Sequence, residues 1–200
     1  MPEGVQRDSS AITYALENLY RDQDFDWVVD TIPAVLAWVP TTGRERPPFV
    51  FRLSRSDGNP PVSTGANSLS LTWNLGALEA RDPTLRERAR RMRAGRTAQR
   101  EHVVELAEYG LALVAISALL PGERVVDMER YRAPDLLLDN TPGRLRGVEV
   151  AARSAGGVGA LTGMRNDKIA LILPRKDVLE RHLSLWCGDP RMGLFARVKP

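Results

Sequence analysis

The stretch that decides the fold is PDLLLDNTPGRLRGVEVAAR, residues 134–153. It contains two runs with the alternation of β-strands, joined by an Asn-Thr-Pro-Gly turn at 140–143. In a hairpin centred on Pro142, Asp135 lies opposite Glu149. Side chains that face each other across an antiparallel pair have Cβ atoms roughly 4.5–5.5 Å apart. The sequence therefore predicts two neighbouring carboxylates, close enough to share one hard cation.

The carboxylate pair predicts a metal site on physical grounds as well as from the sequence pattern. Two adjacent carboxylates without a cation would repel each other. The inference depends on the register, because a loop shorter by one residue would move Glu149 out of line with Asp135.

These residues, with a helix predicted on each side, resemble the core of the PD-(D/E)xK, or restriction-endonuclease-like, superfamily. The resemblance covers about residues 97–187 and is specific in order but loose in residue identity. It implies that Asp135 and Glu149 bind Mg²⁺ or Mn²⁺ and that nucleic acid is the substrate. It also implies a restriction-endonuclease-like core: a central mixed β-sheet flanked by helices.

The chain departs from the family at one position. The family has a Lys two residues after the second acid, where this sequence has Ala151. Two residues are candidates to supply the missing cation, Arg153 on the same strand and Lys168 on the following helix, and the sequence leaves the choice open. An acid on the helix before the metal strands sometimes completes the site in this family, which makes Glu105 a further candidate ligand.

Two helices are predicted around the hairpin. The first runs from about 97 to 120 and is apolar nearly all round in its second half, so it is expected to be buried. The second follows the small-residue run at 154–159 and ends at Pro174. Beyond it, a short helical turn is predicted at 176–181, followed by two strands at 182–187 and 192–198.

The first 96 residues predict an elaboration made of helices and one hairpin. Ser9 and Ser10 favour a helix up to about Tyr20. A second helix, ending at Pro40, is predicted to kink or break near Thr31 because Pro33 removes a helical hydrogen bond. Strands at 49–53 and 68–73 would enclose a loop at 54–67, and a strand is also predicted at 123–130.

Composition indicates a single α/β domain. The chain has 200 residues, of which 43% are hydrophobic, enough for one sizeable core. We expect the elaboration at 1–96 and the restriction-endonuclease-like core at 97–200 to form one compact unit. The single cysteine, Cys187, excludes an internal disulfide and fits a reducing compartment. The polar N-terminus lacks the apolar core of a signal peptide, and the apolar run at 110–120 is too short to span a bilayer. A cytoplasmic location away from membranes is therefore expected.

Positive charge is concentrated between residues 83 and 100. Seven arginines stand there against the single acid Glu87. This segment is either a solvated basic helix or an arm that contacts the phosphates of a nucleic acid. No aromatic residue is interleaved with the arginines, which favours backbone contact over base stacking. The candidate nucleic-acid-binding residues are Arg86, Arg90, Arg93, Arg96 and Arg100.

Other chemistries have little support in the sequence. The two histidines, His102 and His182, lack metal-ligand spacing, so a zinc site is not expected. No GxSxG motif or nucleophile–His arrangement is present.

Three functions therefore stay open. The first is Mg²⁺-dependent cleavage of nucleic acid, with Asp135, Glu149 and either Lys168 or Arg153 in the site. The second is a catalytically inactive relative that serves as a binding or scaffold subunit in a larger assembly. The third is a metal-free interaction module whose acids meet a basic partner. Many cleaving members of the resembled family act as dimers, so the resemblance also raises a homodimer as one arrangement.

Overall fold

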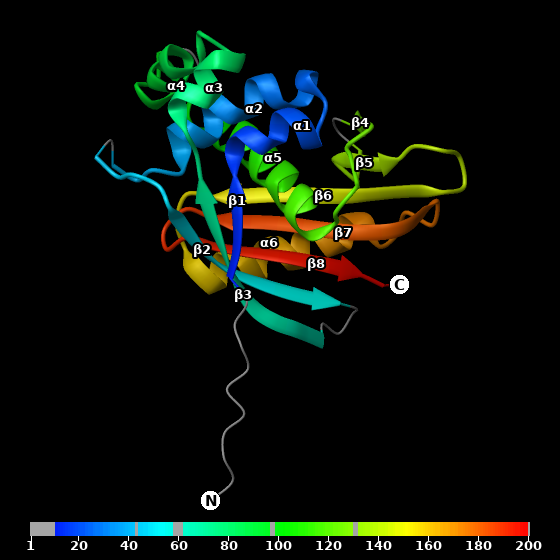
Figure 1. The fold of residues 1–200 in the computed structure, drawn as a ribbon. Coiled ribbons are helices and arrows are strands. Elements are labelled where there is room, and N and C mark those ends of the chain that lie inside the picture. Colours follow the sequence, from blue (N-terminus) through cyan, green and yellow to red (C-terminus); the bar gives the residue numbers. More distant parts are fainter. Residues whose placement is uncertain (1–10, 43, 58–61, 97–98, 130–131, 200) are drawn as a thin grey trace, which may run out of the picture.

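The computed structural model describes residues 11–42, 44–57, 62–96, 99–129 and 132–199, with side chains at 62–67 left aside. Its centre is one eight-stranded mixed sheet in the order β1-β3-β2-β8-β7-β6-β5-β4 (Figure 1). The strands are β1 (Ala11–Ala15), β2 (Phe49–Asp57), β3 (Val62–Thr72), β4 (Asp127–Met128), β5 (Leu136–Asp139), β6 (Leu145–Arg153), β7 (Val178–Cys187) and β8 (Met192–Val198). The helices are η1 (Leu16–Asn18), a 3₁₀ turn, and α1 (Leu19–Asp22), α2 (Phe25–Trp38), α3 (Leu75–Arg81), α4 (Leu85–Arg93), α5 (Arg100–Leu119) and α6 (Gly157–Ile172). The predicted α/β class with a central mixed sheet is confirmed.

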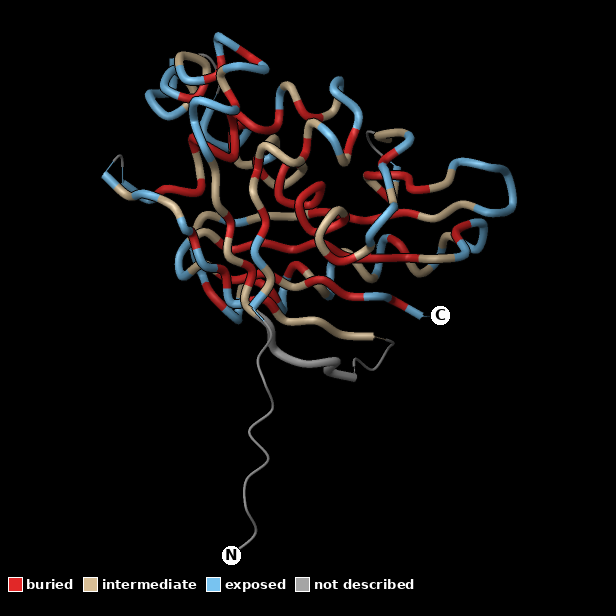
Figure 2. Tube along the Cα trace, viewed as in Figure 1, coloured by how far each residue is buried: buried red, intermediate tan, exposed pale blue. Residues whose placement is uncertain are grey.

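Helices cover both faces of the sheet. Val148 and Val150 of β6 belong to the larger core, which includes the buried faces of α2 and α5. On the opposite face, Leu161 and Met164 of α6 pack against Leu183 and other residues of β7 and β8. Figure 2 shows the buried segments running through the sheet and α5. The alternation along β6 therefore directs the side chain of Glu149 toward the face that α6 covers.

The two halves of the chain share this sheet. β2, from the N-terminal elaboration, pairs in parallel with β8, from the C-terminal core. The order of β8, β7, β6 and β5 then continues without interruption to the predicted carboxylate pair.

The start of the described chain corrects one prediction. The expected helix up to Tyr20 is wrong over Ala11–Ala15, which form β1 and pair in parallel with β3. Ile12 and Tyr14 alternate with smaller residues, and Tyr14 is buried. Pairing with β3 therefore outweighs the helix-starting serines, which lie outside the described residues, and the helical part is reduced to η1 and the short α1.

A kink or a break was predicted near Thr31 because of Pro33, and the break does not occur, since α2 runs unbroken through both residues. A proline cannot donate the helical hydrogen bond to the carbonyl four residues earlier, here that of Val29. Arg88 of α4 donates to that carbonyl instead, at 3.0 Å, and its guanidinium also contacts Asp30 and Asp82. The carbonyl of Val29, which has no donor from Pro33, thus links α2 to α4.

Several strand boundaries differ from those predicted. β2 and β3 extend into the predicted loop at 54–67, up to Asp57 and from Val62, and residues 58–61 lie outside the described chain. β7 begins at Val178, where a helical turn was expected, because Val178 pairs with Leu145 of β6. The strand predicted at 123–130 is reduced to the two residues of β4. In each case pairing with a neighbouring strand, which local sequence does not specify, sets the boundary.

α5 is long and apolar enough to cross a membrane by length and composition. Most of it is buried inside the fold, and the side chains of Leu111, Leu113, Val114 and Ile116 are fully enclosed. A buried position in the core accounts for its apolar character.

Candidate active site

The hairpin places Asp135 beside Glu149. Leu136 pairs with Val148, which is the register expected for a turn centred on Pro142, and the register shifts between Leu137 and Asp139, nearer the turn. Asp135 directly precedes the first pair, and its Oδ2 accepts from the N–H of Val150, the residue after Glu149. Gly147 permits the close approach of the chain before β5. A Cβ atom at Gly147 would lie 2.2 Å from Cγ of Pro134, the residue that precedes Asp135.

Lys168 of α6 meets both carboxylates. Its Nζ lies 2.6 Å from Oε1 of Glu149 and 3.5 Å from Oδ2 of Asp135. The side chain of Glu149 is only 2% exposed, against 18% for Asp135 and 22% for Lys168. The structure therefore brings together three of the residues singled out in the sequence.

Arg153, the other candidate for the missing cation, lies elsewhere. It is the last residue of β6 and its side chain is exposed. None of the ion pairs described for the two acids involves Arg153. Ala151 faces the same side of β6 as Glu149 and packs among the residues under α6. A methyl group at that position leaves room for Lys168 to approach from the helix.

Backbone groups at the edge of β6 also help to position the acids. β5 begins opposite Val148. Beyond that residue, the backbone N–H groups of β6 that point to the β5 side have no partner in β5. The N–H of Val150 donates to Oδ2 of Asp135 at 2.8 Å. The N–H of Ala152 points to the same edge, because the strand repeats every two residues, and its interaction with the carboxylate of Glu108 on α5 acts to lower the pKa of that acid. Glu108 thereby joins the cluster from the helix that precedes the strands.

Sequence reasoning proposed Glu105 for that position and missed Glu108. The structure places Glu105 one turn earlier on α5, with its side chain about half exposed and 3.2 Å from Nδ1 of His102. Glu108 was detectable as the last acid before an apolar segment, since its neighbours Ala107 and Leu111 are fully buried. A charged residue at the border of a buried segment is uncommon unless it has a partner or a role.

Burial and mutual repulsion shift the ionisation of the cluster. Burial and the neighbouring charge of Asp135 raise the pKa of Glu149 to about 7, although Lys168 opposes the shift. Burial raises the pKa of Glu108 to about 8, again against the influence of Lys168. Burial works against the charge of Lys168, but Asp135 and Glu149 outweigh it and raise the pKa of the ammonium group. One cation thus faces three acids, and two of these retain protons near neutral pH.

The cluster fits a divalent cation in its donor chemistry. Oε2 of Glu149 is buried and has no hydrogen-bond partner, which leaves one carboxylate oxygen unused. Mg²⁺ in proteins commonly takes one or two carboxylates and completes its shell with water and substrate phosphate. Within the described residues no group of three His, Cys, Asp or Glu side chains is placed to hold a metal ion. Asp135 and Glu149 therefore fit as a two-carboxylate site rather than as a closed cage.

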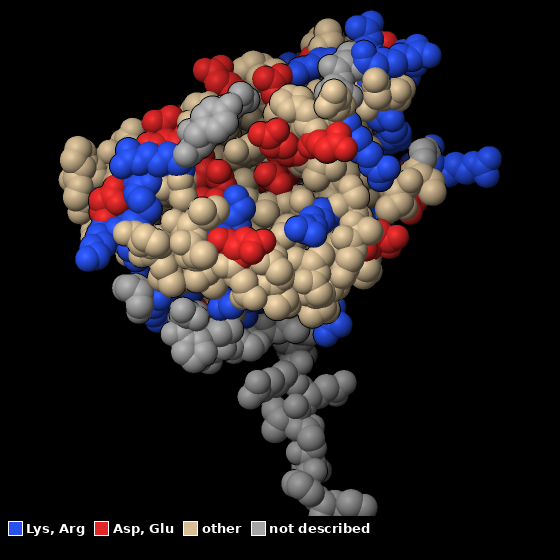
Figure 3. Space-filling view, turned by 180° about the vertical axis from the view of Figure 1, so that it is seen from behind, with Lys and Arg blue, Asp and Glu red and all other residues tan. Residues whose placement is uncertain are grey.

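The arginines of the basic segment take different roles. Arg86, Arg90 and Arg93 recur at the i, i+4 and i+7 spacing that places residues on one face of α4. Arg96 and Arg100, before and at the start of α5, have exposed side chains. Figure 3 shows Asp and Glu side chains gathered across the upper part of the molecule seen from behind, with Lys and Arg side chains at the corner that α4 occupies.

Comparisons with protein-family models, with curated proteins and with solved structures found no match to this chain. The function is therefore argued from the geometry of Lys168 and the surrounding acids.

Proposed function

We propose that this protein is a metal-dependent hydrolase that cleaves phosphodiester bonds of nucleic acid in the cytoplasm. The observation that carries the proposal is the position of Lys168, which contacts Glu149 and Asp135 together. An acidic pair with an adjacent lysine supplies both the ligands for a hard cation and a positive charge for the transition state. Lys168 thereby takes, from a helix, the role expected of the strand position that Ala151 occupies.

Each residue of the cluster has a distinct part in the reaction. Asp135 and Glu149 would hold Mg²⁺ or Mn²⁺, which, when bound, polarises the scissile phosphate and makes water more acidic. The charged ammonium of Lys168 stabilises the negative charge that develops on the phosphate oxygens. Glu108, in the molecules in which its carboxyl group is ionised, accepts a proton from the attacking water; because its pKa is raised to about 8, this fraction grows as the pH rises above neutral. The arginines of α4 hold the phosphate backbone of the strand.

A specific observation supports the rival function, an inactive relative that acts as a binding or scaffold subunit. The 2.6 Å contact between Lys168 and Glu149 already compensates one buried carboxylate without any metal. In that case the ion pair is a structural feature, and the basic face of α4 meets a partner. Whether the protein forms a homodimer stays a prediction under either function.

Metal titration distinguishes the two functions. We expect calorimetry with Mn²⁺ to show binding by the wild type and binding at least about tenfold weaker in Glu149→Ala, because that variant loses a carboxylate ligand. The same samples should be tested for cleavage of mixed DNA and RNA. Absence of metal binding by the folded wild type would rule out the hydrolase and leave the binding subunit. Asp139→Ala, which removes a partly exposed carboxylate beyond the cluster on β5, is the matched control and should bind as the wild type does.

Metal affinity should depend on pH. The pKa of Glu149 is raised to about 7, so its carboxyl group keeps a proton up to that pH and protons compete with the metal. Apparent affinity for Mn²⁺ should therefore rise about tenfold between pH 6 and pH 8, as one carboxylate is released. Calorimetry across this range measures the effect, and an affinity that stays constant from pH 6 to pH 8 would contradict it. For the same reason, the metal-free protein should lose stability as the pH rises through about 7.

A further inference from the structure

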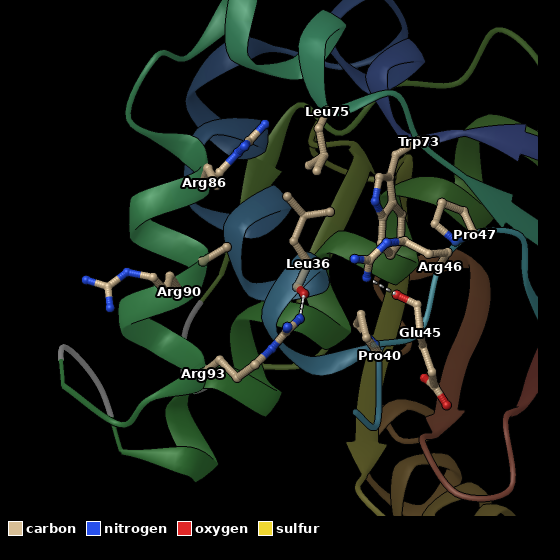
Figure 4. Close-up of a pocket in the computed structure, with 11 residues that line it drawn as sticks. Leu36, Pro40, Glu45, Arg46, Pro47, Trp73, Leu75, Arg86, Arg90 and Arg93 are labelled. Carbon is tan, nitrogen blue, oxygen red and sulfur yellow. Dashed lines mark hydrogen bonds between the residues drawn. The ribbon is translucent and has the colours of Figure 1, made fainter. Parts of the chain in front are cut away.

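A cavity of about 340 Å³ lies between α2, α4 and the segment before β2 (Figure 4). None of its lining residues belongs to the carboxylate cluster. Its apolar lining consists of Leu36, Pro40, Pro47, Trp73, Leu75 and Ala89. The volume is within the range of pockets that bind small organic molecules, roughly 300–1,000 Å³.

Positive charge surrounds this apolar space. Arg86, Arg90 and Arg93 of α4 and Arg46 from the segment before β2 belong to the lining. Figure 4 shows the guanidinium group of Arg93 directed toward Leu36, that of Arg90 directed outward, and Arg46 on the opposite side beside Trp73. Among the described lining residues, four guanidinium groups stand against one carboxylate, that of Glu45, while Arg86 and Arg90 also pair with Glu79 and Glu87, which do not line the cavity. A guanidinium group matches the oxygens of phosphate in a bidentate geometry. The excess of positive charge therefore favours a phosphate group over a single carboxylate.

The contacts of Arg93 favour the binding of an anion. Its guanidinium group donates to the backbone carbonyls of Leu36 and Ala37 at the end of α2, and these acceptors are neutral. Partial burial against α2 lowers the pKa of Arg93. The side chain of Arg93 is nevertheless exposed, and none of the described ion pairs involves it, so an arriving anion would supply an opposite charge.

The aromatic side of the cavity is preorganised. The indole ring of Trp73 stacks on Phe49 with ring centroids 4.6 Å apart and an interplanar angle of 21°. This stacking fixes the orientation of Trp73, whose other parts contribute to the apolar lining beside Leu75. A flat ring that fills the space between Trp73, Leu75 and Pro47 would replace water on apolar surfaces.

We propose that this cavity binds a nucleotide, with the base among Trp73, Leu75 and Pro47 and the phosphate on the arginines of α4. The chemistry recognised is one aromatic base joined to one phosphate, either as a free mononucleotide or as an unpaired nucleotide of a strand. The proposal does not rest on the proposed hydrolase activity, because binding can be measured with EDTA present and the carboxylate cluster inactive.

Two arginines on the same helix provide a matched test. Arg90 and Arg91 both pair with Glu87, and their side chains are similarly exposed, 59% and 55%. Only Arg90 lines the cavity. A diffuse basic surface would be weakened equally by Arg90→Gln and Arg91→Gln, whereas a nucleotide in the cavity depends on Arg90.

The experiment is calorimetric titration of the full chain with AMP, adenosine and inorganic phosphate in EDTA. We expect AMP to bind more tightly than either fragment, and Arg90→Gln to weaken it about tenfold while Arg91→Gln changes affinity less than about twofold. Leu75→Glu should also block binding, because it puts a carboxylate in the cavity. Folding should tolerate this variant, since Leu75 is partly exposed at the first position of α3, where an acid is favourable.

Two further arms distinguish the sources of the nucleotide. Tight binding of a 5′-phosphorylated single-stranded oligonucleotide, sensitive to Arg90→Gln and stronger than binding of a blunt duplex, would identify a strand as the source. Tighter binding of AMP than of the oligonucleotide would identify a free nucleotide. The proposal is overturned if phosphate binds as well as AMP, if the Arg90 and Arg91 variants lose equal affinity, or if neither AMP nor the oligonucleotide binds.

Discussion

Replacement of Lys168 by Met should lower the rate of nucleic-acid cleavage by about 10²–10³-fold, the loss typical of removing one preorganised electrostatic group. Lys168 is the cation that contacts both Asp135 and Glu149, so no other described ion pair compensates these two acids. Metal binding should persist in this variant, because both carboxylates remain. Cleavage rate and Mn²⁺ affinity should be measured on the same preparation. Lys168→Met should then lower the cleavage rate and keep the affinity for Mn²⁺, whereas Glu149→Ala should lower both.

The control is Arg153→Met, which removes the same charge from the exposed end of β6 and should leave cleavage almost unchanged. Lys168→Met also leaves acids without their partner, which costs about 3–5 kcal/mol when the charges are buried. Folding should therefore be verified at pH 6, below the pKa of about 7 for Glu149, where this carboxyl group is mostly protonated. A folded Lys168→Met that cleaves at the wild-type rate, or an inactive Arg153→Met, would contradict the assignment of Lys168.

Replacement of Gly147 by Ala should lower the free energy of unfolding by about 3 kcal/mol, at the upper end of the cost of overpacking. The added Cβ atom would lie 2.2 Å from Cγ of Pro134 and 2.7 Å from the backbone oxygen of Leu136. Both contacts lie in the chain that carries Asp135, so relief of the clash must displace that carboxylate from Glu149. Urea denaturation measures the stability, and Mn²⁺ titration measures the effect on the site.

A second glycine supplies the comparison. Gly159 lies on α6, and a Cβ atom there would meet nothing within 4 Å. Gly159→Ala should therefore raise stability by about 0.5–1 kcal/mol through helix propensity, with metal binding unchanged. If Gly147→Ala unfolds at the same urea concentration as the wild type and binds Mn²⁺ equally well, the close approach of Pro134 to β6 does not position the site.

The hairpin and its neighbouring helices were the predictable part of the fold. Its register followed from local alternation and a short turn, so the position of Asp135 relative to Glu149 could be predicted. The first strand could not, because β1 is fixed by pairing with β3, far along the chain. Arg153 and Lys168 were equivalent in the sequence, since the choice depends on how α6 crosses the sheet. Glu108 was missed because the face of α5 that meets the edge of β6 is set by packing.

The unpaired edge of β6 has a consequence for solubility as well as for chemistry. Free backbone N–H groups on an outer strand are a template to which another polypeptide can add, and this is a common origin of aggregation. Here the carboxylate of Asp135 accepts from the N–H of Val150 at 2.8 Å, and the carboxylate of Glu108 interacts with the N–H of Ala152. The acids thus block strand addition by a second chain at the same place where they form the site. A descendant of this protein that lost these acids would also have to acquire a new means of keeping its chains apart.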